Sequence, residues 1–374
     1  MFVIQLQLSD YRNYRTLDLQ PSAGLNVVVG ANGQGKSNIL EAIYLLATTR
    51  SMRAHRDQEL VRIDTELARV VARVGREVRQ DVAIEIDILA NHKVGKVNGV
   101  RHTRLVDLLG EFNAVQFTPT DVDLITGGPP LRRGFLNLQI AQTSGSYAYA
   151  LIYYKRVLEQ RNRLLRDAAK AGGMSSSGKQ ALEVLTEQLI GYGGQIMERR
   201  GHFVRSLAIY ADRIHRDLVA PDAALHVVYQ PGWPGATTSD DPPAEALRKA
   251  LDVVRTDEMR RGMTLAGPHR DDLQFTVNGM DARIYASRGE QRTVALSMKL
   301  AEFLLLQELN GEAPVMLLDD VLSELDDDRA LRVIQELGPG QAFITGASLR
   351  IFPSDIISHA TMFRVRDGAL QPSA

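Results

Sequence analysis

The fold is decided by residues 27–43, which read Val-Val-Val-Gly-Ala-Asn-Gly-Gln-Gly-Lys-Ser-Asn-Ile-Leu-Glu-Ala-Ile. Three β-branched valines open the stretch and favour a buried strand. Apolar residues from Ile39 onward then recur at helical spacing. Between them, the glycines and Lys36-Ser37 match the pattern G-x-x-x-x-G-K-[ST]. Because a strand, this loop and a helix follow one another, we predict a phosphate-binding loop; the alternative is a plain glycine-rich turn.

The residue types of this loop suit a polyphosphate with its metal ion. Glycine lets the backbone curl so that successive amides point at one anion, and the helix N-terminus adds partial positive charge. Lys36 is expected to reach the β- and γ-phosphates, and the Ser37 hydroxyl to hold Mg²⁺. The predicted ligand contacts are Gly30, Ala31, Asn32, Gly33, Gln34, Gly35, Lys36, Ser37 and Asn38.

A second apolar run ends in two carboxylates. Val315-Met-Leu-Leu-Asp-Asp320 is expected to be a buried strand. Asp319 is then placed to hold Mg²⁺ opposite Ser37. Asp320 would orient or deprotonate the attacking water. The pattern is weak alone, and it gains weight from its position after the phosphate loop.

Two shorter stretches add polar groups. Gln116 ends a short apolar strand, where its side chain would face the metal ion or the attacking water. Ser287 and Gly289 open a helix whose first amides would form a second anion site, although an ordinary N-cap is the alternative.

The composition is that of a globular protein. The chain has 374 residues, which is long enough for two lobes. Apolar side chains make up 44% of the sequence and charged ones 24%. It contains no cysteine, which excludes disulfides, thiolate metal sites and thiol catalysis. No apolar run reaches the roughly 20 residues that cross a bilayer. The N-terminal residues lack signal-peptide features, so we expect a cytoplasmic protein with no membrane partner.

Any nucleic-acid contact would depend on local basic patches, because the net charge is −1. Arg12 lies in the cluster Tyr11–Arg15 and would touch a base or a phosphate. The other candidate phosphate contacts are Arg50–Arg56, Arg132-Arg133 and Lys155–Arg166. A solvated charged face is the alternative for each of them.

The remaining patterns give a coarse structure. Residues 67–74 and 81–89 alternate and predict antiparallel strands. Residues 147–218 predict helices, with a break at 172–178 and two later helices at about 179–200 and 203–218.

A loop at Gly267-Pro-His-Arg-Asp-Asp272 brings one imidazole and two carboxylates together. One histidine and two adjacent aspartates in a loop fall short of a metal-ligand pattern. We therefore favour a structural or interlobe role over a metal site.

Taken together, these motifs resemble the ATP-binding-cassette (ABC) ATPases, in the branch that SMC-like proteins share with the RecF family of recombination mediators. The resemblance implies an α/β fold: an SMC-like P-loop ATPase head with an antiparallel β portion and an inserted, mainly helical lobe. Residues 1–115 and 310–374 would form the ATP-binding lobe. Residues 116–309 would form a second lobe, with the helical insert at about 130–220 and the signature motif.

The resemblance also implies roles for particular residues. Gly30–Ser37 would be the Walker A loop and Asp319 the Walker B aspartate, while Asp320 falls where many relatives have a catalytic glutamate. Gln116 is a looser match to the Q-loop, Ser323–Asp326 match the D-loop, and Arg12 would contact the nucleotide. The signature residues would contact the γ-phosphate held by the opposite subunit; they are Ser287, Gly289 and Gln291.

Two residues depart from the pattern of the resemblance. Glu290 stands in the signature where Gln or Gly is commoner, which would soften recognition of the γ-phosphate. Thr345 lies near the usual position of a switch histidine, which suggests slow hydrolysis or a different sensor.

The implied function is ATP-dependent DNA binding in recombinational gap repair, with support for replication and the SOS response. ATP and Mg²⁺ would drive a homodimer, and weak, DNA-stimulated hydrolysis would release it. The partners would be single-stranded and duplex DNA at junctions or gaps, and RecR, with RecO and RecA in the pathway. The alternatives are an ABC transporter subunit, an SMC-like structural ATPase, and a nucleotide-binding module without significant hydrolysis.

Overall fold

The computed structural model describes residues 1–233, 241–322 and 326–372. They form two compact units: unit 1 comprises Met1–Val122, Arg213–Asp222 and Arg292–Ala374, and unit 2 comprises Asp123–Asp212 and Ala223–Gln291. The boundaries predicted from the sequence were 115/116 and 309/310, whereas the units divide at 122/123, at 222/223, and inside the two long helices α5 (Ser176–Leu218) and α8 (Arg288–Asn310). An uninterrupted helical pattern carries no signal at such a boundary.

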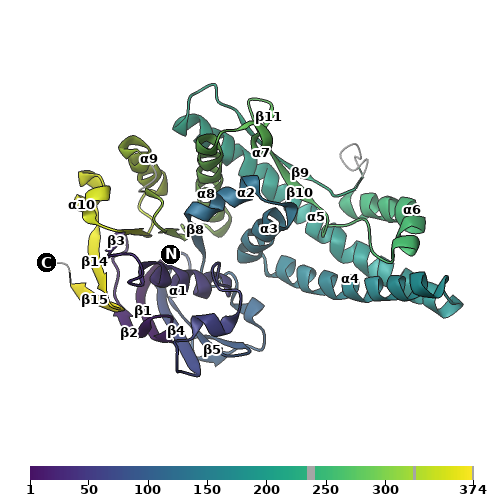
Figure 1. Ribbon diagram of the computed structural model, residues 1–374, viewed down its shortest axis with the longest axis horizontal. Coiled ribbons are helices and arrows are strands. Elements are labelled where there is room, and N and C mark those ends of the chain that lie inside the picture. The colour runs from purple at the N-terminus through teal and green to yellow at the C-terminus, as the bar shows by residue number, and fades with distance from the viewer. Residues whose placement is uncertain (234–240, 323–325, 373–374) are drawn as a thin grey trace. The chain divides into compact units, whose positions relative to one another are not determined.

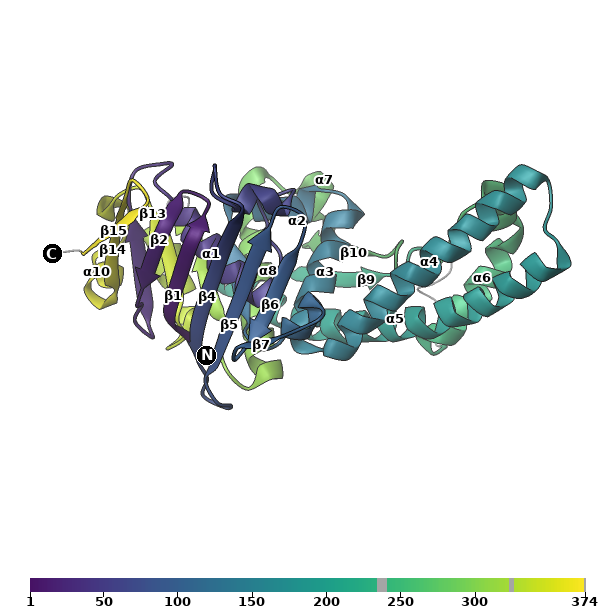
Figure 2. The same ribbon diagram turned by 90° about the horizontal axis from the view of Figure 1, so that it is seen from below.

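Unit 1 contains two six-stranded sheets. Its strands are β1 (Phe2–Tyr11), β2 (Tyr14–Leu19), β3 (Leu25–Val29), β4 (Leu67–Gly75), β5 (Val82–Leu89), β6 (Lys93–Val97), β7 (Val100–Arg101), β8 (Ala114–Phe117), β12 (Val315–Leu318), β13 (Ala342–Gly346), β14 (Thr361–Arg366) and β15 (Ala369–Pro372). The first sheet is antiparallel, in the order β2-β1-β4-β5-β6-β7 (Figure 2). The second has the order β15-β14-β3-β13-β12-β8, and its strands from β14 to β8 are parallel.

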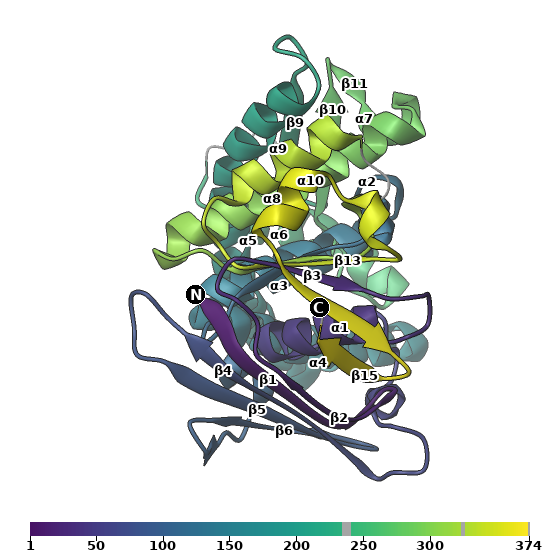
Figure 3. The same cartoon turned by 90° about the vertical axis from the view of Figure 1, so that its left-hand side faces the viewer.

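Helix α1 (Lys36–Thr48) packs between these sheets (Figure 3). It contacts β4 and β5 of the antiparallel sheet, and β8 and β13 of the parallel one. Eleven of its 13 residues are buried. This burial explains why the helix carries apolar residues on nearly all of its sides. Unit 1 also contains α9 (Asp327–Leu337), α10 (Ser354–His359) and short 3₁₀ turns at Asp57–Leu60, Leu105–Leu108, Pro119–Val122 and Leu349–Ile351.

The carboxyl ends of the parallel strands lie along one edge of the second sheet. In an open α/β sheet, ligands bind at this edge. The loop that follows β3 leads into α1, β12 leads directly to Asp319, and β13 ends at Gly346. Gln116 on β8 is in register with Leu317 on β12. The predicted catalytic groups are therefore carried by neighbouring strands.

Unit 2 is mainly helical (Figure 1). Its helices are α2 (Asp123–Thr126), α3 (Pro129–Thr143), α4 (Gly145–Ala171), most of α5, α6 (Pro243–Arg261) and α7 (Ala282–Tyr285). A three-stranded antiparallel sheet has the order β11-β10-β9, formed by β9 (Leu225–Gln230), β10 (Asp272–Val277) and β11 (Met280–Asp281). Among the described helices, none has the length and apolar character that a membrane span requires.

The prediction of two helices after residue 178 is wrong, because α5 is a single helix of 43 residues. Its glycines serve packing. A Cβ atom at Gly193 would lie 2.6 Å from Leu247 Cδ2, and one at Gly194 would lie 2.7 Å from a side chain at the start of α6. The glycines therefore let α6 lie close against α5.

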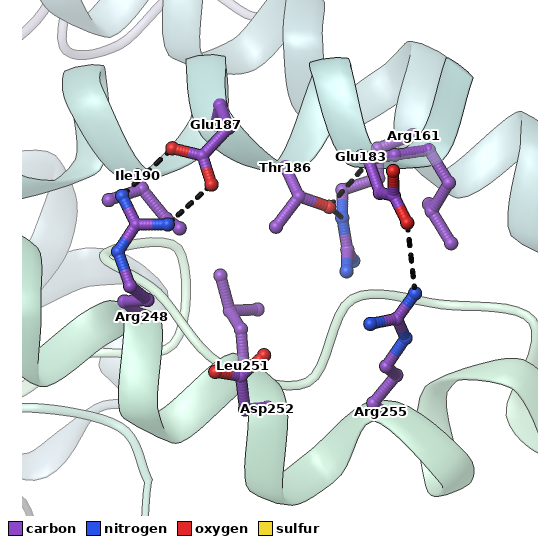
Figure 4. A pocket seen from close by; sticks show the side chains of 10 residues that line it. Arg161, Glu183, Thr186, Glu187, Ile190, Arg248, Leu251, Asp252 and Arg255 are labelled. Carbon is purple, nitrogen blue, oxygen red and sulfur yellow. Dashed lines mark hydrogen bonds and ion pairs between the residues drawn. The ribbon is translucent and has the colours of Figure 1, made fainter. Parts of the chain in front are cut away.

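A buried arginine joins the three long helices of unit 2. Arg161 of α4 donates to Thr186 of α5 (3.1 Å) and to the Glu258 carboxylate of α6 (2.6 Å). It lines a cavity of about 130 Å³ between these helices. Two ion pairs, Glu183–Arg255 and Glu187–Arg248, connect α5 with α6 beside the cavity (Figure 4).

Candidate functional site

The phosphate loop leaves its helix N-terminus without a side-chain cap. Gly33 and Gly35 have φ angles of 81° and 114°, in the region that favours glycine. Gly35 is the N-cap of α1 and makes no side-chain capping bond. A Cβ atom at Gly30 would lie 2.4 Å from the Val365 carbonyl oxygen, so glycine is required there for close approach of β14. This backbone suits an anion at the start of α1.

Lys36 is buried, and its ammonium lies over the loop. Its Nζ donates to the carbonyl oxygens of Gly30 (2.8 Å) and Ala31 (3.2 Å). The cation therefore already lies across the loop whose amides are expected to hold phosphate.

Three oxygen-bearing side chains meet at the strand edge. The hydroxyls of Ser37 and Thr345 both donate to Asp319 Oδ1, each at 2.8 Å. The Thr345 hydroxyl also accepts from the Asp320 backbone amide at 2.9 Å. The structure therefore brings together Ser37 and Asp319, the two predicted metal ligands, although they are 282 positions apart. Thr345, near the position expected for a switch histidine, is part of the same cluster.

Asp320 has an unusual backbone and a perturbed carboxyl group. Its φ of 56° is in the left-handed region, which non-glycine residues seldom adopt. Such strain is concentrated at functional sites. Burial raises its pKa, the positive charge of Lys36 opposes that rise, and the Asp319 carboxylate adds to it. A raised pKa makes a carboxylate a better proton acceptor.

Gln116 supplies the clearest sign that the site accepts a ligand. Its side chain is buried on β8, yet its Oε1 atom has no hydrogen-bond partner among the described residues. A buried polar oxygen without a partner is costly unless a ligand satisfies it. Hydroxyl, carboxylate and amide oxygens are the donors that Mg²⁺ prefers. The residues present therefore fit a magnesium ion.

The turn at residues 11–14 is fixed to the loop. Arg12 donates to both carboxylate oxygens of Glu41 (2.8 and 2.7 Å) and to the Glu59 carbonyl. Asn13 donates to the Gln34 carbonyl, and the Tyr14 hydroxyl donates to that of Gly35.

Glu41 was not predicted as part of the site, and nothing near it in the chain marks it. Burial alone would raise its pKa, but hydrogen bonds from Arg12 and Ser51 hold the pKa below its ordinary value. The ion pair orients Arg12 beside the loop.

The predicted signature residues lie in unit 2, at the N-terminus of α8. The Ser287 hydroxyl accepts from the Glu290 amide, and the Glu290 carboxylate accepts from the Ser287 amide, which is the reciprocal geometry of a capping box. Gln291 is buried, and its amide donates to the carbonyls of Ala282 and Arg283. Gly289 is exposed, and a Cβ atom there would meet nothing within 4 Å.

The predicted D-loop lies mostly outside the described residues, which resume at Asp326. The Asp326 side chain caps α9 by accepting from the Arg329 amide at 2.9 Å.

Comparison with known proteins identifies the family. The family model described as RecF/RecN/SMC N terminal domain matches residues 2–349. The chain is 38% identical to the DNA replication and repair protein RecF of Oceanobacillus iheyensis, over 99% of this chain and 100% of that protein. The chain belongs to the RecF family. The RecF of Bacillus subtilis strain 168 is 37% identical, again over 99% and 100% of the two chains.

Solved structures confirm the expected SMC-like ABC ATPase fold of this RecF-family chain. A structure described as the recombination mediator RecF with ATP in the RecFOR pathway has a TM-score of 0.90 and 32% identity, covering 100% of this chain and 98% of that one. The Smc head domain of Pyrococcus furiosus has a TM-score of 0.56 and 18% identity, over 99% and 95% of the two chains. The second likeness concerns the fold alone.

In this RecF-family chain, the loop at Gly267–Asp272 is built into a buried network of unit 2. Asp271 accepts from Arg200 (2.9 Å), from the Tyr229 hydroxyl and from the Gly232 amide (3.1 Å). No group of three possible metal-ligating side chains occurs among the described residues. Sequence reasoning did not identify Arg200, because it lies within a helical pattern and its partner Asp271 is 71 positions away.

The neighbouring charges are also internal to unit 2. His269 accepts from the Tyr154 hydroxyl at Nδ1 (2.6 Å) and faces the Thr264 carbonyl with Nε2 (3.3 Å). Burial lowers its pKa to about 4. Arg132 is buried and binds both carboxylate oxygens of Asp272, so its predicted contact with DNA phosphate is wrong.

Proposed function

We propose that this RecF-family chain is an ATP-dependent DNA-binding protein of recombinational gap repair, controlled by two ATP molecules sandwiched between two copies. The observation that carries the proposal is the cluster at the strand edge. Ser37 and Asp319 meet there beside an open helix N-terminus, and buried Gln116 offers an oxygen with no partner. These are the groups that a magnesium–polyphosphate complex needs.

Each group has a proposed part in ATP binding. The amides from Gly30 to Asn38 cradle the phosphates, Lys36 leaves its carbonyl partners to pair with the β- and γ-phosphates, and Arg12 contacts the nucleotide. Mg²⁺ would be held by Ser37, Asp319 and Gln116, and when bound it neutralises charge on the phosphates.

Hydrolysis is proposed to be weak and stimulated by DNA. Asp320, with its raised pKa, orients the attacking water and accepts its proton, and Gln116 is proposed to face the same water. An aspartate has a shorter reach than a glutamate, which favours slow turnover. This observation keeps a second candidate function open, in which the site binds ATP and hydrolyses it negligibly.

The second half of each ATP site is proposed to come from the other copy. Ser287 and Gly289 would approach the γ-phosphate bound to the partner's loop, while Gln291 holds the backbone behind them. Neither half alone surrounds the γ-phosphate. ATP therefore favours the dimer, and hydrolysis releases it.

Membership of the family supports the proposed cellular role. Relatives are named for DNA replication and repair, and a solved relative is placed in the RecFOR pathway. We propose binding at junctions between single-stranded and duplex DNA, action with RecR and RecO to help load RecA, and support of replication and the SOS response, all in the cytoplasm. Exposed basic residues available for phosphate contacts are Arg50, Arg53, Arg56, Lys155, Arg156, Arg163 and Arg166.

Light scattering tests the proposal. The molar mass of the wild type and of Ser287→Arg is measured with and without ATP and Mg²⁺. We expect ATP to double the mass of the wild type only, because the bulky cation blocks the opposite half-site. Tight ATP binding without any change in the wild-type mass would contradict the sandwich.

Salt dependence tests the DNA contacts. Phosphate contacts release counterions, so affinity for a gapped duplex should fall steeply between low and moderate salt. Replacement of Arg53 and Arg56 by Gln should weaken binding and flatten that dependence. A DNA affinity that does not change with salt concentration would contradict the proposed phosphate contacts of these basic residues.

A further inference from the structure

Thr345 contacts both aspartates that follow β12, through a hydroxyl whose orientation is fixed. A hydroxyl has one proton to donate and lone pairs that accept. Thr345 Oγ1 donates its proton to Asp319 Oδ1 at 2.8 Å, and it accepts from the Asp320 backbone amide at 2.9 Å. The side chain is fully buried. One side chain therefore connects the predicted metal ligand Asp319 with the backbone of the predicted base Asp320.

The Thr345 hydroxyl lies in a rigid part of the sheet. Thr345 belongs to β13, which pairs with β12 on one side and with β3 on the other. In the pairing with β3 it lies opposite Val28, just before the phosphate loop. Its branched Cβ atom restricts the χ1 angle. The position of the hydroxyl is therefore set by the strands and does not depend on the segment that follows β12.

The backbone of Asp320 is strained and needs such a support. The Asp319 amide still follows the ladder between β12 and β8, and it donates to the Phe117 carbonyl at 2.9 Å. At Asp320 the φ angle is 56°, in the left-handed region. A non-glycine residue keeps this conformation only where its surroundings fix it. The Thr345 hydroxyl accepts from the amide of this strained residue, as the Phe117 carbonyl does one residue earlier.

We infer that Thr345 is a positioning residue for ATP hydrolysis: its hydroxyl fixes the left-handed backbone of Asp320 and thereby orients the Asp320 carboxyl group toward the attacking water. The inference rests on the proposed function, in which Asp320 accepts the proton of that water. A catalytic group that is misplaced by about 1 Å costs on the order of 100-fold in rate. Thr345 needs no contact with the reacting atoms, because it acts through the backbone of Asp320.

Hydrogen exchange tests this link in the protein without nucleotide. Thr345→Val keeps the shape of the side chain and removes the hydroxyl, whereas Thr345→Ser keeps the hydroxyl. Exchange at the Asp320 amide is measured by mass spectrometry with fragmentation that resolves single residues. We expect exchange at least about tenfold faster in Thr345→Val, and wild-type protection in Thr345→Ser, because only the hydroxyl accepts from this amide. Equal rates in the wild type and Thr345→Val would overturn the inference.

Single-turnover hydrolysis tests the consequence, with excess protein, radiolabelled ATP, Mg²⁺ and gapped DNA. Thr345→Val should hydrolyse ATP roughly 100-fold more slowly than the wild type. Its affinity for a fluorescent ATP analogue should stay within about threefold of the wild type, because the lost interaction serves the transition state. Thr345→Ser should retain most of the rate. A merely structural role would not give this division between rate and affinity.

The matched control is Thr264→Val in unit 2. Thr264 is also a buried threonine, and its hydroxyl likewise accepts one hydrogen bond, from Arg161 (2.8 Å), and donates one, to Asn162 (2.7 Å). Its substitution should lower stability and leave the rate of hydrolysis unchanged. A loss of rate in Thr264→Val equal to that in Thr345→Val would overturn the inference, because the effect would not be specific to the site.

A double substitution shows whether Thr345 acts through Asp320. In an Asp320→Ala background, Thr345→Val should cause no further loss of rate. A further loss of the same size would overturn the inference, because Thr345 would then act independently. If Asp320→Ala slows hydrolysis and Thr345→Val does not, the inference fails and the proposed role of Asp320 stands. If Asp320→Ala hydrolyses ATP as fast as the wild type, or the wild type does not hydrolyse ATP, the proposed base and the inference both fail.

Discussion

Two polar clusters, one in each unit, differ in how completely their groups are satisfied. In unit 1, Ser37 and Asp319 meet at a strand edge where the buried Gln116 Oε1 has no partner among the described residues. In unit 2, Arg200 uses all three guanidinium nitrogens, on Tyr147, Asn137, Asp271 and the Pro268 carbonyl. Each cluster includes a residue of a conspicuous sequence motif, Ser37 in the first and Asp271 in the second, yet of the two only the first leaves capacity for a ligand.

The difference teaches how to tell a binding motif from a structural one. A buried polar group without a partner costs stability and is retained where a ligand uses it. A buried ion pair with every position satisfied fixes one packing arrangement and has nothing left to bind. Substitutions in the Arg200 cluster should therefore change stability, and those in the cluster of Ser37 and Asp319 should change ligand binding.

The largest effect is expected at Arg200. Arg200→Met leaves the buried Asp271 carboxylate without its cation and should lower the free energy of unfolding by about 3–5 kcal/mol. Thermal and denaturant unfolding measure this loss. The control is Arg199→Met, an exposed neighbour on the same helix, which should stay within about 0.5 kcal/mol of the wild type. Similar stability of the two variants would erase the contrast between the clusters.

The matching change in unit 1 is Asp319→Asn. It removes the charge that faces Ser37 and the metal position, and we expect affinity for Mg²⁺–ATP to fall roughly 100-fold. The folded state should keep its stability, because the amide can still accept from the Ser37 and Thr345 hydroxyls. Calorimetric titration and thermal unfolding are read together, with exposed Asp222→Asn as the control. A large loss of stability with unchanged affinity would reassign the cluster as structural.

Substitution of two glycines of α5 by alanine tests how tightly α5 packs against α6 in unit 2. Gly193→Ala places a Cβ atom 2.6 Å from Leu247, so overpacking should cost about 1–3 kcal/mol. Gly191→Ala meets nothing within 4 Å on the same helix and should stabilise by about 0.5–1 kcal/mol. Denaturant unfolding gives both values, and equal signs would contradict the packing account.

The smallest effect concerns pH. His269 has a folded pKa of about 4, below its ordinary value of 6.5. As pH falls below 6.5 the unfolded chain takes up a proton that the folded chain refuses, so stability falls until pH approaches 4. At pH 6 the loss should be about 1 kcal/mol.

The control for this prediction is His269→Gln, which lacks the titrating ring and should show a flatter profile between pH 7 and 5. Parallel profiles for the two proteins would mean that His269 is ordinary in the folded state.

Local residue patterns and short spacings allow individual loops and strands to be predicted from the sequence. The phosphate loop, the strand that precedes Asp319 and the antiparallel strands at 67–74 and 81–89 all follow from periodicity and glycine placement. Ser37 and Asp319 were predicted as ligands of one magnesium ion, from the phosphate-loop pattern and from the apolar run that ends in two carboxylates, and their side chains are in contact.

Long-range pairing was beyond such reasoning. Glu41 lies inside an apolar helix, and its role depends on Arg12, 29 positions away. Arg200 lies in a helix rich in charged residues, and only the fold shows that it is buried. In the sequence, the glycines of α5 suggested helix breaks. Their packing role depends on the close approach of α6, which local sequence does not show.

The central claim is that each ATP site combines Lys36 of one copy with Ser287 of the other. The most direct measurement mixes two inactive variants, Lys36→Ala and Ser287→Arg, each carrying a different mass tag, and identifies species by native mass spectrometry with ATP and Mg²⁺. Each variant alone should stay monomeric. The mixture should form a heterodimer with one nucleotide, because Lys36 of one chain and Ser287 of the other complete a single site. A mixture that stays monomeric while the wild type dimerises would contradict the shared site.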